Sequence, residues 1–136
     1  MHFETILPVT KPVGVSNDLI FSAPATPFMD LVIHSLESFN HEWLWMNYPS
    51  VMFSTGPMAL SALYSTWCRI LGNGVGLGES PEKQRVRILP KSMYGKNALP
   101  EEVPLSFFWH YYGSSWHAND AGFVGFVRLQ GPSTCH

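Results

Sequence analysis

The stretch TGPMALSALYSTWCRILGNG, residues 55–74, decides how this chain folds. It opens with Thr55-Gly56-Pro57, a helix start, because proline fits the first helical position, where its missing N–H has no partner to lose. Gly72-Asn73-Gly74 is typical of a helix end. Apolar residues between the two signals recur at helical spacing and form one face of the helix: Met58, Ala62, Leu63, Trp67, Ile70 and Leu71. The sequence therefore predicts a helix that packs through this face.

Weaker signals on both sides of this helix predict a mixed α/β chain. A first helix is expected from Thr26-Pro27, with Thr26 as its cap and Asp30 in its first turn. Leu19-Ile20-Phe21 is predicted to be a short buried strand, and Val86-Arg87-Ile88-Leu89 alternates like a second strand. No complete series of βαβ units is present, so the expected class is α/β with short strands.

The composition is apolar, with few charges. Hydrophobic residues make up 46% of the 136 residues and charged residues 13%, whereas typical soluble domains carry about 25% charged residues. We therefore expect part of the surface to pack against another segment or partner. A net charge of −2 without a basic tract argues against nucleic-acid binding. Cys68 lies beside Trp67 and near Leu71 and forms no CxxC pair, which predicts a buried free thiol.

Neither a secretory signal nor a transmembrane helix is predicted. The N-terminus has no basic region followed by an apolar run. Residues 43–68 contain no Asp, Glu, Lys or Arg and are long enough to cross a bilayer. Polar and helix-breaking residues interrupt them, however: Asn47, Pro49, Ser54, Gly56 and Pro57. We predict a buried loop followed by a helix for this stretch.

Three short segments could carry chemistry. Ser16-Asn17-Asp18 could hydrogen-bond sugar hydroxyls, or form an ordinary Asx-turn before a strand. Ser54-Thr55-Gly56-Pro57 could bind a diphosphate at a helix N-terminus, or simply cap the helix. Gly113-Ser114-Ser115-Trp116-His117, with Asn119 and Asp120 behind it, offers hydroxyls, an aromatic ring for stacking and a potential metal ligand. The residues alone leave these alternatives open.

Taken in order, several stretches resemble fungal glycosyltransferase family 32, in particular its mannosyltransferases that act on inositol phosphoceramide. The likeness extends from about Leu7 to Val127. The matching stretches are Pro12-Val13-Gly14-Val15-Ser16-Asn17-Asp18, Ser22-Ala23-Pro24 with Pro27-Phe28, Val51-Met52-Phe53-Ser54-Thr55-Gly56-Pro57-Met58, Tyr94-Gly95-Lys96-Asn97, and Gly113-Ser114-Ser115-Trp116-His117 with Asp120-Ala121-Gly122-Phe123.

This resemblance implies a GT-A-like nucleotide-diphospho-sugar transferase domain. The family pattern implies GDP-mannose as donor, inositol phosphoceramide as acceptor, Mn²⁺ at the diphosphate and a place at the lumenal side of the Golgi membrane. Asn17 and Asp18 would be the catalytic, acceptor-side residues, and His117 would be a metal ligand. The donor-binding residues would be Ser54, Thr55, Gly56, Ser115 and Trp116.

The chain departs from the family pattern in one respect that bears on activity. Family members carry an Asp-x-Asp motif that supplies the main metal ligands, whereas the aspartates here are Asp18, Asp30 and Asp120. We therefore expect residues 1–136 to be the C-terminal part of the GT-A-like domain, without its N-terminal nucleotide-binding half or the family's membrane segments. The alternative is a catalytically inactive remnant that at most binds a ligand or partner, so whether this chain is an enzyme stays open.

Overall fold

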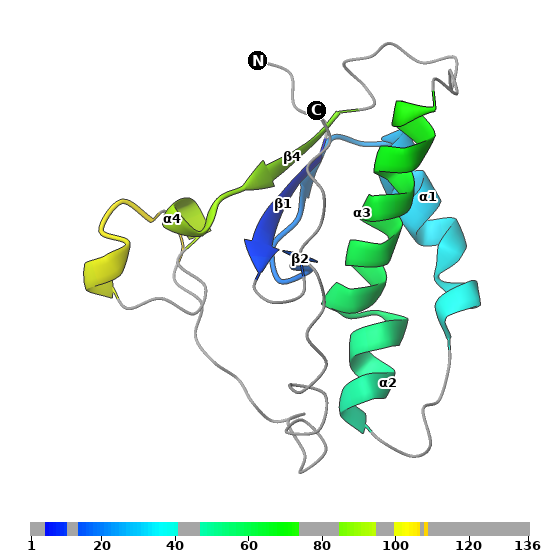
Figure 1. The fold of residues 1–136 in the computed structure, drawn as a ribbon, viewed down its shortest axis with the longest axis horizontal. Helices are drawn as coiled ribbons and strands as arrows, with labels where there is room; N and C mark the ends of the chain where they lie inside the picture. Colours follow the sequence, from blue (N-terminus) through cyan, green and yellow to red (C-terminus); the bar gives the residue numbers. More distant parts are fainter. Residues whose placement is uncertain are drawn as a thin grey trace.

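A small β-sheet lies beside a layer of helices in this chain (Figure 1). The structure is a computed structural model, and it describes residues 5–10, 14–40, 47–73, 85–94, 100–106 and 108. Helices and strands both occur in the described residues, which confirms the predicted mixed α/β class.

The sheet is organised around one strand, β1 (Thr5–Thr10). Two short strands, β2 (Gly14–Val15) and β3 (Phe21–Ser22), run antiparallel to it. The predicted strand β4 (Val86–Leu89) is confirmed and runs parallel to β1. Because β1 and β4 are parallel, the segments that follow them leave the sheet at the same end.

The sequence did not predict β1, because Pro8 lies within it. Proline has no N–H for a strand ladder and is uncommon in a central strand. Its carbonyl oxygen is still used, since it accepts a 2.8 Å hydrogen bond from the N–H of Ser16. Thr5 and Leu7 are fully buried on this strand, so burial of its side chains outweighs the missing donor.

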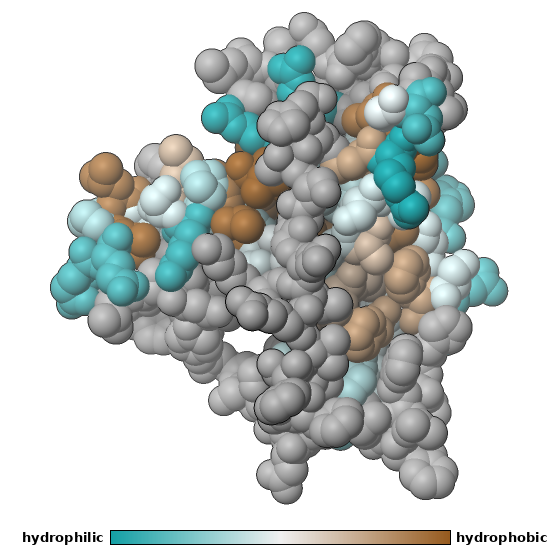
Figure 2. Space-filling model, in the orientation of Figure 1, coloured by the Kyte–Doolittle hydropathy of each residue, from teal (hydrophilic) through white to brown (hydrophobic). Residues whose placement is uncertain are grey.

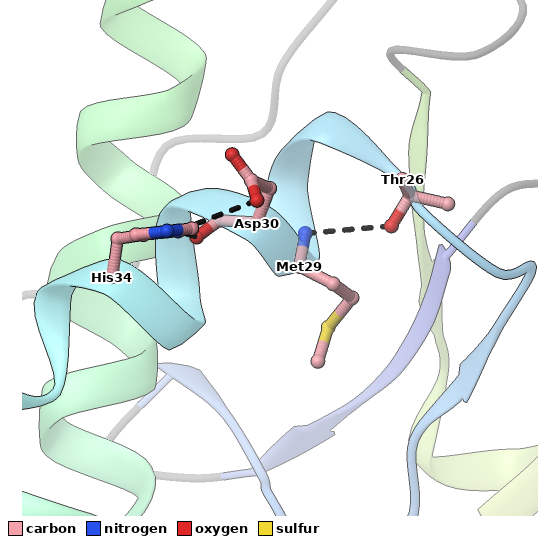
Figure 3. A network of polar contacts seen from close by, with 4 residues as sticks. All are labelled: Thr26, Met29, Asp30 and His34. Carbon is pink, nitrogen blue, oxygen red and sulfur yellow. Dashed lines mark hydrogen bonds and ion pairs between the residues drawn. The ribbon is translucent and has the colours of Figure 1, made fainter.

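Helix α1 (Pro27–Ser35) begins where the sequence predicts. The Thr26 hydroxyl accepts a hydrogen bond of 3.4 Å from the N–H of Met29, which caps the helix (Figure 3). Asp30 lies in the first turn and pairs with His34 one turn later, 3.3 Å from Oδ1 to Nδ1. A short 3-10 helix, η1 (Glu37–Phe39), follows α1.

The helix predicted from the opening stretch is α3 (Pro57–Gly72), and it supplies much of the core. Its buried face is rotated slightly from the predicted one, because Ala62 is exposed whereas Leu60 and Tyr64 are buried. Trp67 meets Phe28 of α1 edge-on, with ring centroids 5.9 Å apart. The described core cluster is Leu7, Val15, Phe28, Leu60, Tyr64 and Trp67.

Three local predictions need correction. The buried strand expected at residues 19–21 is instead β3, and Phe21 is 45% exposed, because its ring packs against the surface ring of Phe108. Residues 47–54, expected as a loop, form helix α2 (Asn47–Ser54), whose Pro49 occupies the first turn, where proline is tolerated. Cys68 is disulfide-bonded, so the prediction of a free thiol is wrong.

The last described elements are α4 (Lys91–Tyr94) and the 3-10 helix η2 (Pro100–Glu102). Large apolar side chains are exposed nearby, including Leu105 at 83% and Met93 at 41%. Brown, apolar residues are visible on the side of the molecule where α4 lies (Figure 2). None of the helices in the described part of the chain has the length and apolar character needed to cross a membrane.

Candidate functional site

The segment Ser16-Asn17-Asp18 follows β2 and forms a tight turn on the surface. Ser16 is fully buried, and its hydroxyl accepts a 3.4 Å hydrogen bond from the N–H of Asp18. This is a serine turn, in which a side chain bonds the backbone two residues later. Because Ser16 is anchored inside, the next two side chains, Asn17 and Asp18, are exposed. The turn therefore presents an amide and a carboxylate to solvent.

The structure brings this turn to the second predicted segment. The side-chain nitrogen of Asn17 donates a 3.0 Å hydrogen bond to the carbonyl oxygen of Thr55, which lies between α2 and α3. These residues are 38 positions apart in the sequence. The predicted acceptor side and the predicted donor side are thus neighbours, joined by a direct hydrogen bond.

A second link holds the same two parts of the molecule together. Ser61, in the second turn of α3, accepts a 3.0 Å hydrogen bond from the N–H of Val15 in β2. The Ser61 hydroxyl also lies 2.7 Å from the carbonyl oxygen of Pro57, to which it donates. The end of β2 is therefore fixed against the N-terminal turns of α3, one residue before the Ser16-Asn17-Asp18 turn begins.

Gly56 forms the junction between α2 and α3 and is buried. Its N–H donates a 2.7 Å hydrogen bond to the carbonyl oxygen of Val51. A Cβ atom at Gly56 would lie 2.5 Å from that oxygen and 2.8 Å from Cα of Met52, so no larger residue fits without movement of the backbone. Close packing of α2 against this position accounts for the glycine, and donor binding by Gly56 stays a prediction.

Tyr94, the last residue of α4, reaches the same turn from the other side. It is 4% exposed, and its hydroxyl donates a 3.3 Å hydrogen bond to Oδ2 of Asp18. Burial raises the pKa of the Tyr94 phenol well above its usual value, and the negative charge of Asp18 and the hydrogen bond to it raise it further. The phenol is therefore a stable hydrogen-bond donor to this carboxylate at neutral pH.

Sequence reasoning gave no role to Tyr94. The one signal for it was its place in Tyr94-Gly95-Lys96-Asn97, a stretch that resembles the family. Its contact with Asp18 spans 76 positions, and nothing in the local pattern of either residue predicts the other. The contact depends on the pairing of β4 with β1, which sequence periodicity does not reveal.

The third predicted segment lies outside the described residues, and with it Ser115, Trp116 and His117. Among the residues that are described, no group of three His, Cys, Asp or Glu side chains could hold a metal ion. The Asp18 carboxylate, which lies in the turn, already accepts the Tyr94 hydroxyl through Oδ2. Mn²⁺ favours several oxygen ligands, so the described residues do not by themselves fit a Mn²⁺ centre.

Comparison with known proteins adds an independent observation. The chain is 39% identical over 116 residues to inositol phosphoceramide mannosyltransferase 1 of Schizosaccharomyces pombe, which covers 85% of this chain and 31% of that protein. It is 34% identical over 121 residues to mannosyl phosphorylinositol ceramide synthase SUR1 of Saccharomyces cerevisiae, covering 89% and 28%. The predicted resemblance to inositol phosphoceramide mannosyltransferases is confirmed.

The likeness to these mannosyltransferases covers most of this chain but a minor part of each relative. The chain spans about 30% of the length of the curated relatives it matches, including mannosyltransferase 2 of Schizosaccharomyces pombe, to which it is 37% identical over 115 residues. No protein-family model matches the chain, and no solved structure matches it with significant similarity. The likeness therefore rests on sequence identity to these mannosyltransferases.

Proposed function

We propose that this chain carries part of the catalytic domain of a mannosyltransferase that transfers mannose from GDP-mannose to inositol phosphoceramide, with residues of both the acceptor side and the donor side. The observation that carries the proposal is the 39% identity over 116 residues to a protein named inositol phosphoceramide mannosyltransferase 1. GDP-mannose as the donor comes from the family resemblance. The hydrogen bond between Asn17 and Thr55 supports it, because it joins the two segments to which the family pattern gives acceptor and donor roles.

On the acceptor side, Asp18 would be the residue that touches the substrate. Its carboxylate is exposed, and a carboxylate oxygen is a strong acceptor for a sugar or inositol hydroxyl. Asn17 would act differently, since its side-chain nitrogen already donates to Thr55 and so fixes the turn relative to the helices. Positioning of the acceptor hydroxyl in this way lowers the entropic cost of bringing it to the donor.

On the donor side, Ser54 and Thr55 would contribute hydroxyls where α3 begins. The N-terminus of this 16-residue helix favours negative charge, which suits the diphosphate of GDP-mannose. Gly56 would act through the tight junction that sets the direction of α3. Ser115 and Trp116 complete the donor-binding residues that the proposal takes from the family pattern.

A GT-A-like domain and a bound Mn²⁺ belong to the proposal as well, with His117 as a metal ligand. When bound, Mn²⁺ would neutralise charge on the diphosphate leaving group. The described residues do not by themselves form a site for the ion. The disulfide at Cys68 supports a lumenal, oxidising location such as the Golgi, since disulfides are rare in the cytosol.

The test measures binding of soluble ligands to the purified chain by ligand-observed NMR. We expect inositol 1-phosphate, the headgroup of the acceptor, to bind, and Asp18→Asn to weaken that binding. Asp30→Asn is the matched control, because Asp30 is an exposed carboxylate on α1 whose described partner is His34, away from the turn. Equal binding by both variants would refute the acceptor role of Asp18.

A second arm of the experiment addresses the donor. GDP-mannose is titrated into the chain with and without Mn²⁺. Binding that depends on Mn²⁺ would favour an active donor site, whereas headgroup binding without any nucleotide binding would favour an inactive, ligand-binding remnant. The two outcomes distinguish an active mannosyltransferase domain from an inactive remnant that binds a ligand.

A further inference from the structure

Tyr94 is placed where it can control the proposed acceptor residue without touching a ligand itself. Its side chain is 4% exposed, so its ring is out of reach of a ligand in solution. Its hydroxyl nevertheless contacts Oδ2 of Asp18, which is exposed. The hydrogen bond to Asp18 is therefore a route by which Tyr94 can affect ligand binding.

The topology explains why these two residues meet. β4 is parallel to β1, so the segment after β4 leaves the sheet at the carboxyl end of β1. That segment is α4, which ends at Tyr94 and packs close to β1. The hairpin from β1 into β2 begins at the same end of the sheet and leads to Asp18. Two connections of the sheet thus converge, and functional groups commonly gather at such carboxyl ends of parallel strands.

The two exposed side chains of the turn are held by different parts of the molecule. Asn17 is fixed by the junction between α2 and α3, through the carbonyl of Thr55. Asp18, the next residue, is fixed by α4, through the Tyr94 hydroxyl. A carboxylate on an exposed turn otherwise samples several rotamers, and a hydrogen bond from a rigid, buried donor selects one of them.

We propose that Tyr94 is a positioning residue that orients the Asp18 carboxylate toward a hydroxyl of the inositol phosphate headgroup. The proposal rests on the acceptor role of Asp18 set out above. It gives α4 a part in acceptor recognition. It also gives a reason for the burial of Tyr94, because a donor fixed by packing orients its partner better than a mobile one.

The experiment is a double-mutant cycle on the purified chain, with inositol 1-phosphate binding measured by ligand-observed NMR. Tyr94→Phe keeps the buried ring and removes the hydroxyl. We expect it to weaken binding roughly tenfold, a difference of about 1.4 kcal/mol. In the Asp18→Asn background the same substitution should have almost no effect, because the group on which Tyr94 acts is already altered.

A merely structural role predicts a different pattern. It would change thermal stability and would act equally in both backgrounds of the cycle. Tyr64→Phe is the matched control, since Tyr64 is an equally buried tyrosine on α3, and it should leave headgroup binding unchanged. Asp18→Glu is a second variant that keeps the charge but displaces the carboxylate, and it should also weaken binding.

The possible results divide clearly. Unchanged binding in Tyr94→Phe, or equal losses in the two backgrounds, would overturn the positioning role and leave the proposed function intact. If Tyr94→Phe does not fold, headgroup binding by Asp18→Glu as tight as that of the unmodified chain would overturn it instead. Absence of headgroup binding by the unmodified chain would overturn the acceptor role and the positioning role together.

Discussion

Replacement of Gly56 by alanine should destabilise the chain through a purely steric effect at the α2–α3 junction. The backbone of Gly56 has φ −86° and ψ −171°, which alanine adopts without strain. The added Cβ, however, would lie 2.5 Å from the Val51 carbonyl oxygen and 2.8 Å from Cα of Met52. Ordinary van der Waals contact begins near 3.4 Å, and both neighbours are backbone atoms that cannot rotate away.

The magnitude follows from two opposing contributions. Forcing an extra carbon into a packed site costs roughly 1–3 kcal/mol, and occasionally more. Loss of glycine flexibility in the unfolded chain offsets this by about 0.4–1 kcal/mol. Because the clash is with backbone, we expect a net loss of about 2 kcal/mol, which lowers the melting temperature by about 4 °C per kcal/mol for a domain of this size.

Thermal melts followed by circular dichroism measure this loss. The matched control is Gly72→Ala at the end of α3, where an added Cβ would meet nothing within 4 Å. That variant should gain up to about 1 kcal/mol, because alanine favours the helix more than glycine does. A Gly56→Ala variant as stable as the unmodified chain would refute the steric argument. Inositol 1-phosphate binding should weaken as well, since the clash displaces the Thr55 carbonyl that holds Asn17.

Three further predictions concern the same region. Ser61→Ala should lower the free energy of unfolding, measured in urea, by about 1–3 kcal/mol, because it leaves the N–H of Val15 without its partner. The control Ser65→Ala, on the exposed side of α3, should change it by less than about 0.5 kcal/mol. Tyr94 has a raised pKa when folded, so its protonated phenol stabilises the fold below pH about 10, and that stability is lost as the unfolded phenol ionises above it. The free energy of unfolding, measured from pH 8 to 11, should therefore fall more steeply with pH for the unmodified chain than for Tyr94→Phe. An equal fall in both proteins would contradict this. The chain alone should not transfer mannose from GDP-mannose to inositol phosphoceramide in the presence of Mn²⁺, because it has no Asp-x-Asp motif. Loss of even one preorganised electrostatic group costs roughly 10²–10³ in rate. Turnover comparable to that of a full-length relative would contradict this expectation.

Local signals in the sequence were sufficient for the elements that are built from local interactions. The cap at Thr26, the start of α3 at Pro57 and the strand at residues 86–89 were predicted, and all three are present. Each depends on side chains a few positions apart, so spacing in the sequence carries the information. The same holds for the Ser16-Asn17-Asp18 turn, although its bond is made by Ser16 rather than by the Asx side chain.

Only the tertiary structure decided which of these pieces meet. Pro8 argues against a strand at residues 5–10, so neither β1 nor its parallel pairing with β4 was predicted. That pairing places α4, which follows β4, beside the turn. Tyr94 and Asp18 lie 76 positions apart, and Asn17 and Thr55 lie 38 positions apart. Residue types and spacing limit what each segment can do chemically, but contacts over such separations depend on packing of the whole sheet against α1 and α3, which no local pattern contains.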